Sequence, residues 1–197
     1  MPERPRRVLV LHGAGSLGAS HAPFVADAVR RGFQAVAPDL PGHGDEPPLS
    51  EVVLYAIVAE IEPDTALRGS SLGAFLALHA AAADERVAAV VALAPTTEQL
   101  ILERYPEWPA RVDGPSFEAW LRGRNIFDAV ARIACPVLYV HARDDERIPL
   151  EISEQLHTLT PGSELVELDT GGHSGPPHDP AVHELTLDWL EHVFSYR

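Results

Sequence analysis

Short runs of apolar residues alternate with stretches of helical character along most of this 197-residue chain. The runs lie at residues 8–11, 33–37, 66–67, 87–93, 137–140 and 165–168. Nearly all residues of these runs are apolar, which is typical of strands buried on both faces of a parallel sheet. The pattern therefore predicts an α/β fold, in which helices flank a mostly parallel central sheet.

Cap and turn residues predict where the intervening helices begin and end. The expected helices are 23–31, then 50–62 with Ser50 as its cap, then the alanine-rich stretch 74–83, and a last helix that begins at Asp179 and Pro180.

One segment, residues 95–134, contains no strand-like run and is rich in aromatic residues. This segment predicts a small helical insertion within a single domain that spans residues 1–197. Its aromatic side chains can line an apolar pocket or bury the insertion on the core, and both interpretations stay open. They are Tyr105, Trp108, Phe117, Trp120 and Phe127.

The sequence contains no lysine, so all 15 basic residues are arginine. This absence excludes a lysine Schiff base, the lysine of a phosphate-binding P-loop and the Tyr-x-x-x-Lys pair of short-chain dehydrogenases. The ten histidines include no His-Glu-x-x-His motif and no pairing with cysteine. We therefore expect no metal site and no cofactor.

The formal charge of −14 disfavours nucleic acid and membrane surfaces as partners, because both are anionic. A lone cysteine, Cys135, cannot form an internal disulfide and is expected to be a small buried thiol. The first apolar run is too short for a signal peptide or a membrane span. The expected location is cytoplasmic, and the oligomeric state stays open.

Gly13, Gly15 and Gly18 match the Gly-x-Gly-x-x-Gly pattern of dinucleotide sites, and Asp39 follows the next strand. Residues 19–22 separate these glycines from the expected helix start, so the helix N-terminus would not reach a pyrophosphate. Asp39 also lies in a turn rich in glycine and proline. The pattern is therefore interpreted as a loop with another role.

A second glycine motif follows the third strand: Gly69 and Gly73 flank Ser71 as Gly-x-Ser-x-Gly, directly before the alanine-rich helix. A serine nucleophile on a strained turn between a strand and a helix needs glycines beside it. Ser70 does not fit this register, because Arg68 and Leu72 would occupy the glycine positions. Arg68 itself is unusual in an apolar strand, and can pair with a carboxylate or extend to water.

Three segments that follow expected strands resemble the α/β-hydrolase fold family: residues 12–15 (His-Gly-Ala-Gly), 39–44 (Asp-Leu-Pro-Gly-His-Gly) and 69–73. The resemblance covers nearly the whole chain. It implies that the first strand corresponds to the family's third, so that the chain is a minimal member. It also implies that residues 95–134 form a small cap over the nucleophile.

By the same resemblance, the catalytic residues follow in the order serine, acid, histidine. The acid lies in a turn after the strand that follows the cap, which favours Asp145, with Asp144 as the alternative. His173, in a glycine-rich loop past the last strand, is the expected base, with His178 as the alternative. His157 lies in a further helical stretch, 151–159, and His183 and His192 lie in the last expected helix. All three are interpreted as structural.

The family resemblance also implies that the backbone N–H groups of Ala14 and Leu72 form the oxyanion hole. His12 and His43 are interpreted as residues that shape their turns. The predicted function is a cofactor-independent serine hydrolase that cleaves a carboxylic ester or thioester of a small molecule. The alternatives are a non-catalytic protein that binds a small ligand, or amide or carbon–carbon bond hydrolysis by the same triad.

Overall fold

The computed structural model describes residues 6–196, and within them six strands form one parallel sheet. The strand order is β2-β1-β3-β4-β5-β6, and each neighbouring pair is parallel. The strands are β1 (Arg7–Leu11), β2 (Gln34–Val36), β3 (Thr65–Ser70), β4 (Val87–Leu93), β5 (Val137–Ala142) and β6 (Glu164–Leu168). All six predicted strands are present, and the predicted α/β class is confirmed.

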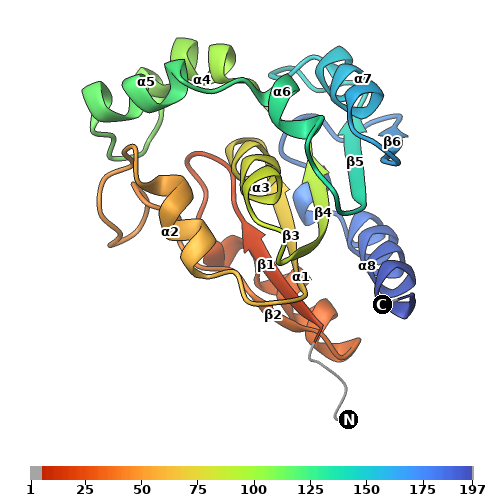
Figure 1. Cartoon of the computed structure of the whole chain (residues 1–197). Coiled ribbons are helices and arrows are strands. Elements are labelled where there is room, and N and C mark those ends of the chain that lie inside the picture. The colour runs from red at the N-terminus through yellow and green to blue at the C-terminus, as the bar shows by residue number, and fades with distance from the viewer. Residues whose placement is uncertain (1–5, 197) are drawn as a thin grey trace.

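Helices cover both faces of the sheet (Figure 1). Alternate residues of one strand enter separate clusters: Val8 and Val10 pack with the helices α1 (Ala22–Arg30) and α8 (Pro180–Ser195). Leu9 and Leu11 face the cluster formed with the helices α2 (Val53–Ala59), α3 (Leu72–Ala83) and α7 (Leu150–Leu159). Burial on both faces is the reason that the inner strand β4 is apolar at every position, whereas the edge strands β2 and β6 are partly exposed and carry polar residues.

The two helices on the first face begin and end close to the predicted positions. In α8, the Asp179 carboxylate accepts a hydrogen bond from the Ala181 N–H at 2.8 Å, which satisfies an N–H group at the helix start. After α1, Gly32 adopts a positive φ of 83°. This left-handed residue ends the helix, as a glycine at this position commonly does.

The predicted cap and limits of the second helix are wrong. The helix α2 begins at Val53 rather than after Ser50, and its N-terminus has no side-chain cap. The preceding residue Leu49 exchanges backbone hydrogen bonds with Arg111 and Asp113, which holds this segment extended against the insertion. This tertiary pairing delays the start of the helix.

The segment predicted as a helical insertion contains the helices α4 (Glu98–Arg104), α5 (Gly114–Arg122) and α6 (Ile126–Val130) and a short 3₁₀ turn (η2, Tyr105–Glu107). These helices arch over the end of α3, the predicted alanine-rich helix (Figure 1). Ten of the residues of α3 are buried, because the sheet, α2 and the insertion helix α6 surround it. No helix between residues 6 and 196 is long and apolar enough to span a membrane.

Candidate active site

Ser71 lies at the sharp junction between β3 and α3. Its backbone has a φ of 52° and a ψ of −114°, which is a conformation that side-chain-bearing residues rarely adopt. A Cβ atom on Gly69 would lie 2.3 Å from the carbonyl oxygen of Gly73. One on Gly73 would lie 2.0 Å from the carbonyl oxygen of Leu11. Both glycines of the motif are therefore sterically required, and Ser71 is presented on a tight turn.

The glycine-rich loop after β1 lies against this turn. A Cβ atom built on Gly13 would be 3.4 Å from the Cβ atom of Ser71. Within the described part of the chain, the Ala14 N–H donates to no protein acceptor. Leu72 is the first residue of α3, so its N–H has no acceptor within the helix. These are the two N–H groups that the sequence predicted as an oxyanion hole.

Two buried histidines, His12 and His43, hold the shape of this loop. The Leu40 N–H donates to His12 Nε2 at 2.8 Å, and the Gly15 N–H donates to His43 Nε2 at 3.0 Å. Each Nδ1 faces a backbone carbonyl, so each ring is neutral with its proton on Nδ1. Burial lowers the pKa of His12, which favours this neutral form. Both rings are placed as turn-shaping residues.

Asp145 and His173 are in direct contact. The His173 Nδ1–H donates to Asp145 Oδ2 at 2.8 Å, and the Asp145 side chain is only 1% exposed. The backbone N–H groups of Arg147 and Ile148 both donate to Asp145 Oδ1 at 2.8 Å. Burial alone would raise the pKa of Asp145, but hydrogen bonds from His141, His173 and these N–H groups outweigh it and hold the pKa below its usual range.

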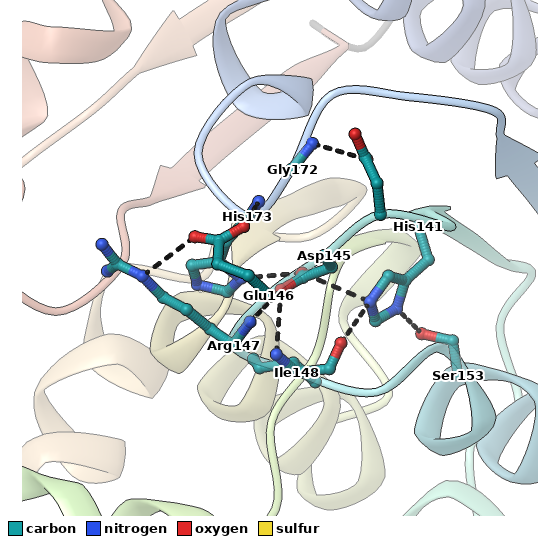
Figure 2. Close-up of polar contacts among 9 residues, drawn as sticks. His141, Asp145, Glu146, Arg147, Ile148, Ser153, Gly172 and His173 are labelled. Atoms are coloured by element: carbon teal, nitrogen blue, oxygen red, sulfur yellow. Dashed lines mark hydrogen bonds and ion pairs between the residues drawn. The ribbon is translucent and has the colours of Figure 1, made fainter.

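The acids on either side of Asp145 contact the same histidine loop through its backbone, and Figure 2 shows Glu146 beside His173. Asp144 Oδ1 accepts a hydrogen bond from the Gly172 N–H at 2.8 Å, and Glu146 Oε2 accepts one from the His173 N–H at 3.1 Å. Of the two candidate acids, Asp145 is therefore the one bonded to the His173 ring. Asp144 contacts the backbone of the loop.

Ser71 and His173 line one cavity of about 560 Å³. Gly13, Ala14 and the alternative base His178 also line it. The His178 ring lies beside His21 with a centroid distance of 5.1 Å, and within residues 6–196 the hydrogen bonds of Asp144 and Asp145 to the last loop go to Gly172 and His173 rather than to His178. The remaining wall comes largely from the insertion and from the turn after Asp145, through Leu100, Arg104, Glu107, Trp108, Pro109, Arg147 and Ile148.

The aromatic residues of the insertion divide between the two interpretations left open by the sequence. Phe117 is fully buried and stacks on Trp120 with a centroid distance of 5.8 Å, so these rings pack the insertion onto the core. Trp108 instead lines the cavity that contains Ser71. It also lines a neighbouring cavity, with Gly15 and Pro109 common to both.

Asp39, which follows the Gly-x-Gly-x-x-Gly pattern, faces the loop itself. Its Oδ1 accepts a hydrogen bond from the Gly18 N–H at 2.7 Å. A short 3₁₀ turn (η1, Gly18–His21) separates the glycines from α1. Asp39 therefore ties two loops together.

Both sequence interpretations of Arg68 are wrong. The guanidinium is buried, neither extending to water nor contacting a carboxylate within the described residues. Its Cζ lies 4.0 Å from the centroid of the Phe24 ring, and Nη2 donates to the Pro177 carbonyl oxygen at 3.2 Å. Burial lowers the pKa of Arg68 to about 9. A cation–π contact and one carbonyl thus take the place of a counter-ion.

The other histidines beyond Asp145 lie away from the Asp145 carboxylate. His183 is buried between Asp27 and Pro177, His157 contacts Ser163, and the His192 ring lies against Tyr196. Cys135 is buried, as expected. Among residues 6–196, no group of three His, Cys, Asp or Glu side chains lies close enough together to hold a metal ion.

Sequence reasoning missed His141, a fully buried residue of β5. His141 Nε2 lies 3.3 Å from Asp145 Oδ2 and 3.0 Å from the Ile148 carbonyl oxygen. The available signal was a single histidine in an otherwise apolar strand, which does not by itself indicate a partner.

A family model described as the alpha/beta hydrolase family matches residues 8–131, more than half of the chain. The chain belongs to the alpha/beta hydrolase family. This finding confirms the resemblance inferred from the sequence motifs. The match includes Ser71 and ends before Asp145 and His173.

Curated relatives of this family member include esterases. A pimeloyl-[acyl-carrier protein] methyl ester esterase from Xanthomonas campestris is 34% identical over 114 residues, which cover 56% of this chain and 44% of the relative. A putative carbamate hydrolase from Klebsiella pneumoniae is 50% identical over 42 residues, which cover 21% of this chain and 16% of the relative. The alignments thus span less than half the length of these relatives.

Solved structures show the same fold over nearly the whole chain. Mouse alpha/beta hydrolase domain-containing protein 10 has a TM-score of 0.80 at 19% identity and covers 100% of this chain and 92% of its own. A monoacylglycerol lipase from Paleococcus ferrophilus has a TM-score of 0.75 at 20% identity and covers 96% of each chain. At these identities the likeness shows the fold alone.

Proposed function

We propose that this hydrolase-family protein is a cofactor-independent serine hydrolase that cleaves carboxylic esters or thioesters through an acyl-enzyme on Ser71. One observation carries the proposal: Ser71 lines the same cavity as His173, and the His173 ring donates to the buried carboxylate of Asp145. The esterase relative supports an ester as the bond that is cleaved.

In the first half of the reaction, Ser71 Oγ attacks the carbonyl carbon while His173 Nε2 accepts the hydroxyl proton. Because Nδ1 donates to Asp145, Nε2 is the ring nitrogen left to act as the base. The negative charge that develops on the carbonyl oxygen is stabilised by the N–H groups of Ala14 and Leu72. The position of Leu72 at the start of α3 adds the positive end of the helix dipole.

Collapse of this intermediate breaks the bond to the leaving group, and His173 returns the proton to the departing alcohol or thiol. In the second half, a water molecule attacks the acyl-enzyme and gives its proton to His173. The new tetrahedral intermediate then releases the carboxylic acid and restores the Ser71 hydroxyl. No step requires a lysine, a metal or an organic cofactor.

A fluorophosphonate probe tests the nucleophile directly. The protein is expected to be labelled stoichiometrically, and Ser71→Ala is expected to abolish the labelling. Ser70→Ala is the matched control, because Ser70 lines the same cavity one position away on β3. Labelling that persists in Ser71→Ala would refute the assignment.

Turnover of p-nitrophenyl acetate separates an esterase from a non-catalytic binding protein. We expect turnover that is lost in His173→Ala and kept in His178→Ala, since His178 lines the cavity without a bond to Asp145. Ligand binding without turnover would favour the binding protein. A p-nitrophenyl carbamate included in the same series tests whether the protein shares the activity named for its second relative.

A further inference from the structure

His141 occupies a buried position behind Asp145, on the side opposite to His173 (Figure 2). We propose that His141 is a positioning residue that holds the Asp145 carboxylate in place for His173. The proposal rests on the proposed serine-hydrolase function. His141 lies outside the cavity wall, so it acts through the residues that it contacts, and of these Asp145 is the one bonded to the His173 ring.

The contacts of His141 decide where its protons lie. Nε2 faces two acceptors, the carboxylate Oδ2 of Asp145 at 3.3 Å and the carbonyl oxygen of Ile148 at 3.0 Å. Neither atom can donate, so Nε2 must carry a proton and donate to both. The 3.3 Å distance and the shared proton make this the weaker of the two histidine contacts on Oδ2, compared with 2.8 Å from His173.

The opposite ring nitrogen has a hydroxyl partner. Ser153 Oγ on α7 lies 2.7 Å from His141 Nδ1, and Ser153 is also fully buried. Within the described residues, no other acceptor is recorded for the Ser153 hydroxyl, so it donates to Nδ1 and the ring is neutral. The neutral ring supplies a donor to Asp145 without placing a second buried cation there, which would have a large desolvation penalty.

Four hydrogen bonds thus converge on one carboxylate. Arg147 and Ile148 supply backbone N–H groups to Oδ1, and His141 and His173 supply ring N–H groups to Oδ2. His173 must be free to change its proton at Nε2 during the reaction, whereas the other three donors are fixed in the core or the turn. His141 is the only side chain among these fixed donors, and it is the one that can be altered without changing the backbone.

The surrounding charges come from four elements. On β6, Glu167 is the register partner of His141 and pairs with Arg143 at 2.5 Å. On the turn itself, Glu146 and Arg147 are exposed and form an ion pair at 3.4 Å. Asp144, on the same turn as Glu146, accepts a hydrogen bond from the Gly172 N–H of the loop that carries His173. On that loop, His178 lines the cavity. From α7, the group that faces His141 is the uncharged Ser153. Within these elements, His141 is thus the neutral buried donor to Asp145, and the charged groups lie toward the solvent side.

Removal of the His141 donor has two expected consequences. The carboxylate loses one of its fixed contacts, so the His173 ring is held less well and kcat/KM falls. The charge on Asp145 is also shared with one fewer donor, so it stabilises the protonated His173 ring more strongly, and the acid limb of the pH profile of kcat/KM moves to higher pH. A side chain that only filled space would lower the melting temperature without moving this limb.

The experiment measures kcat/KM for p-nitrophenyl acetate against pH in His141→Leu, His141→Gln and His157→Leu. In His141→Leu we expect kcat/KM at pH 7 to fall about tenfold, the usual effect of a hydrogen bond to a charged group. The acid limb of the profile should move to higher pH by about half a unit. Gln keeps an N–H donor near the position of Nε2 and should restore most of both changes.

His157→Leu is the matched control. His157 lies on α7 and, like His141, pairs with a serine, since its Nδ1 is 2.8 Å from Ser163 Oγ. It does not contact Asp145. It should leave the profile unchanged. An acid limb that stays in place in His141→Leu, or that moves equally in His157→Leu, would overturn the positioning role.

A second measurement does not depend on turnover. In long-range ¹H–¹⁵N spectra of the wild-type protein, His141 should show the neutral form with its proton on Nε2. A proton on Nδ1 or a charged ring would overturn the proposal even if His141→Leu failed to fold. If the wild-type protein neither hydrolyses esters nor reacts with the fluorophosphonate, the proposed function fails, while these spectra still test the His141 contact.

Discussion

Replacement of Asp145 by asparagine tests the arrangement of the site most directly. The side chain keeps its size, and Oδ1 can still accept from the N–H groups of Arg147 and Ile148. The amide NH₂ then takes the place of Oδ2, opposite the ring N–H groups of His141 and His173. Donor faces donor at both contacts, so His173 can bond the amide only by moving its proton from Nδ1 to Nε2.

That change of tautomer removes the base, because Nε2 can no longer accept the proton of Ser71. We expect kcat/KM for p-nitrophenyl acetate to fall by about 10³-fold to 10⁴-fold at pH 8. The unsatisfied contacts lie where the side chain is only 1% exposed, so the free energy of unfolding should also fall, by about 1 to 3 kcal/mol. Thermal unfolding checks this second value and shows that the variant is folded.

Asp144→Asn is the matched control. Asp144 needs only an acceptor for the Gly172 N–H, and the asparagine carbonyl keeps that contact, so kcat/KM should change by less than about threefold. Activity retained in Asp145→Asn, or a larger loss in Asp144→Asn, would refute the reasoning.

Three further perturbations test other parts of the structure. Gly73→Ala places a Cβ atom 2.0 Å from the Leu11 carbonyl oxygen, so chemical denaturation should show a loss of about 3 kcal/mol or more in the free energy of unfolding. Gly123→Ala is the control and should have little effect, because the nearest atom to its Cβ would lie at 3.6 Å. Burial lowers the pKa of His79 to about 4, so the unfolded chain binds a proton that the folded one does not, and stability should fall as the pH drops from about 6.5 to 4, by up to about 3 kcal/mol. His79→Leu should flatten this slope in melting curves, and an unchanged slope would contradict the role of His79. Trp108→Ala should join the two cavities that Trp108 lines and shift the preferred acyl length of p-nitrophenyl esters upward. The same preferred acyl length in the variant and the wild-type protein would contradict this role of Trp108.

The sheet and most of its helices could be predicted because their signals are local. A strand buried on both faces is largely apolar, and all six predicted runs are strands of the parallel sheet. The start of α2 could not be predicted in this way, because Leu49 pairs with a segment of the insertion far along the chain. A favourable cap residue, Ser50, was overridden by that contact.

The candidate site shows the same division. The turn at Ser71 was readable from sequence because its glycines are required by backbone contacts within a few residues and with the neighbouring strand. The carboxylate that bonds His173 could not be identified from sequence, because Asp144 and Asp145 are adjacent and only the directions of their side chains separate them. His141 and Arg68 were unassigned for a similar reason, because their contacts are made with groups that the strand pattern does not reveal.

By itself, the sequence determined the α/β class, the family and the strand-to-helix turn that presents Ser71, because hydrophobic periodicity and steric requirements act over short distances. Only the tertiary structure decided that Asp145 bonds a histidine 28 residues away, that Trp108 lines the cavity while Phe117 is buried in the core, and that His141 lies behind the carboxylate. These features depend on where separate segments meet, and burial of the two faces of the sheet sets those meeting points.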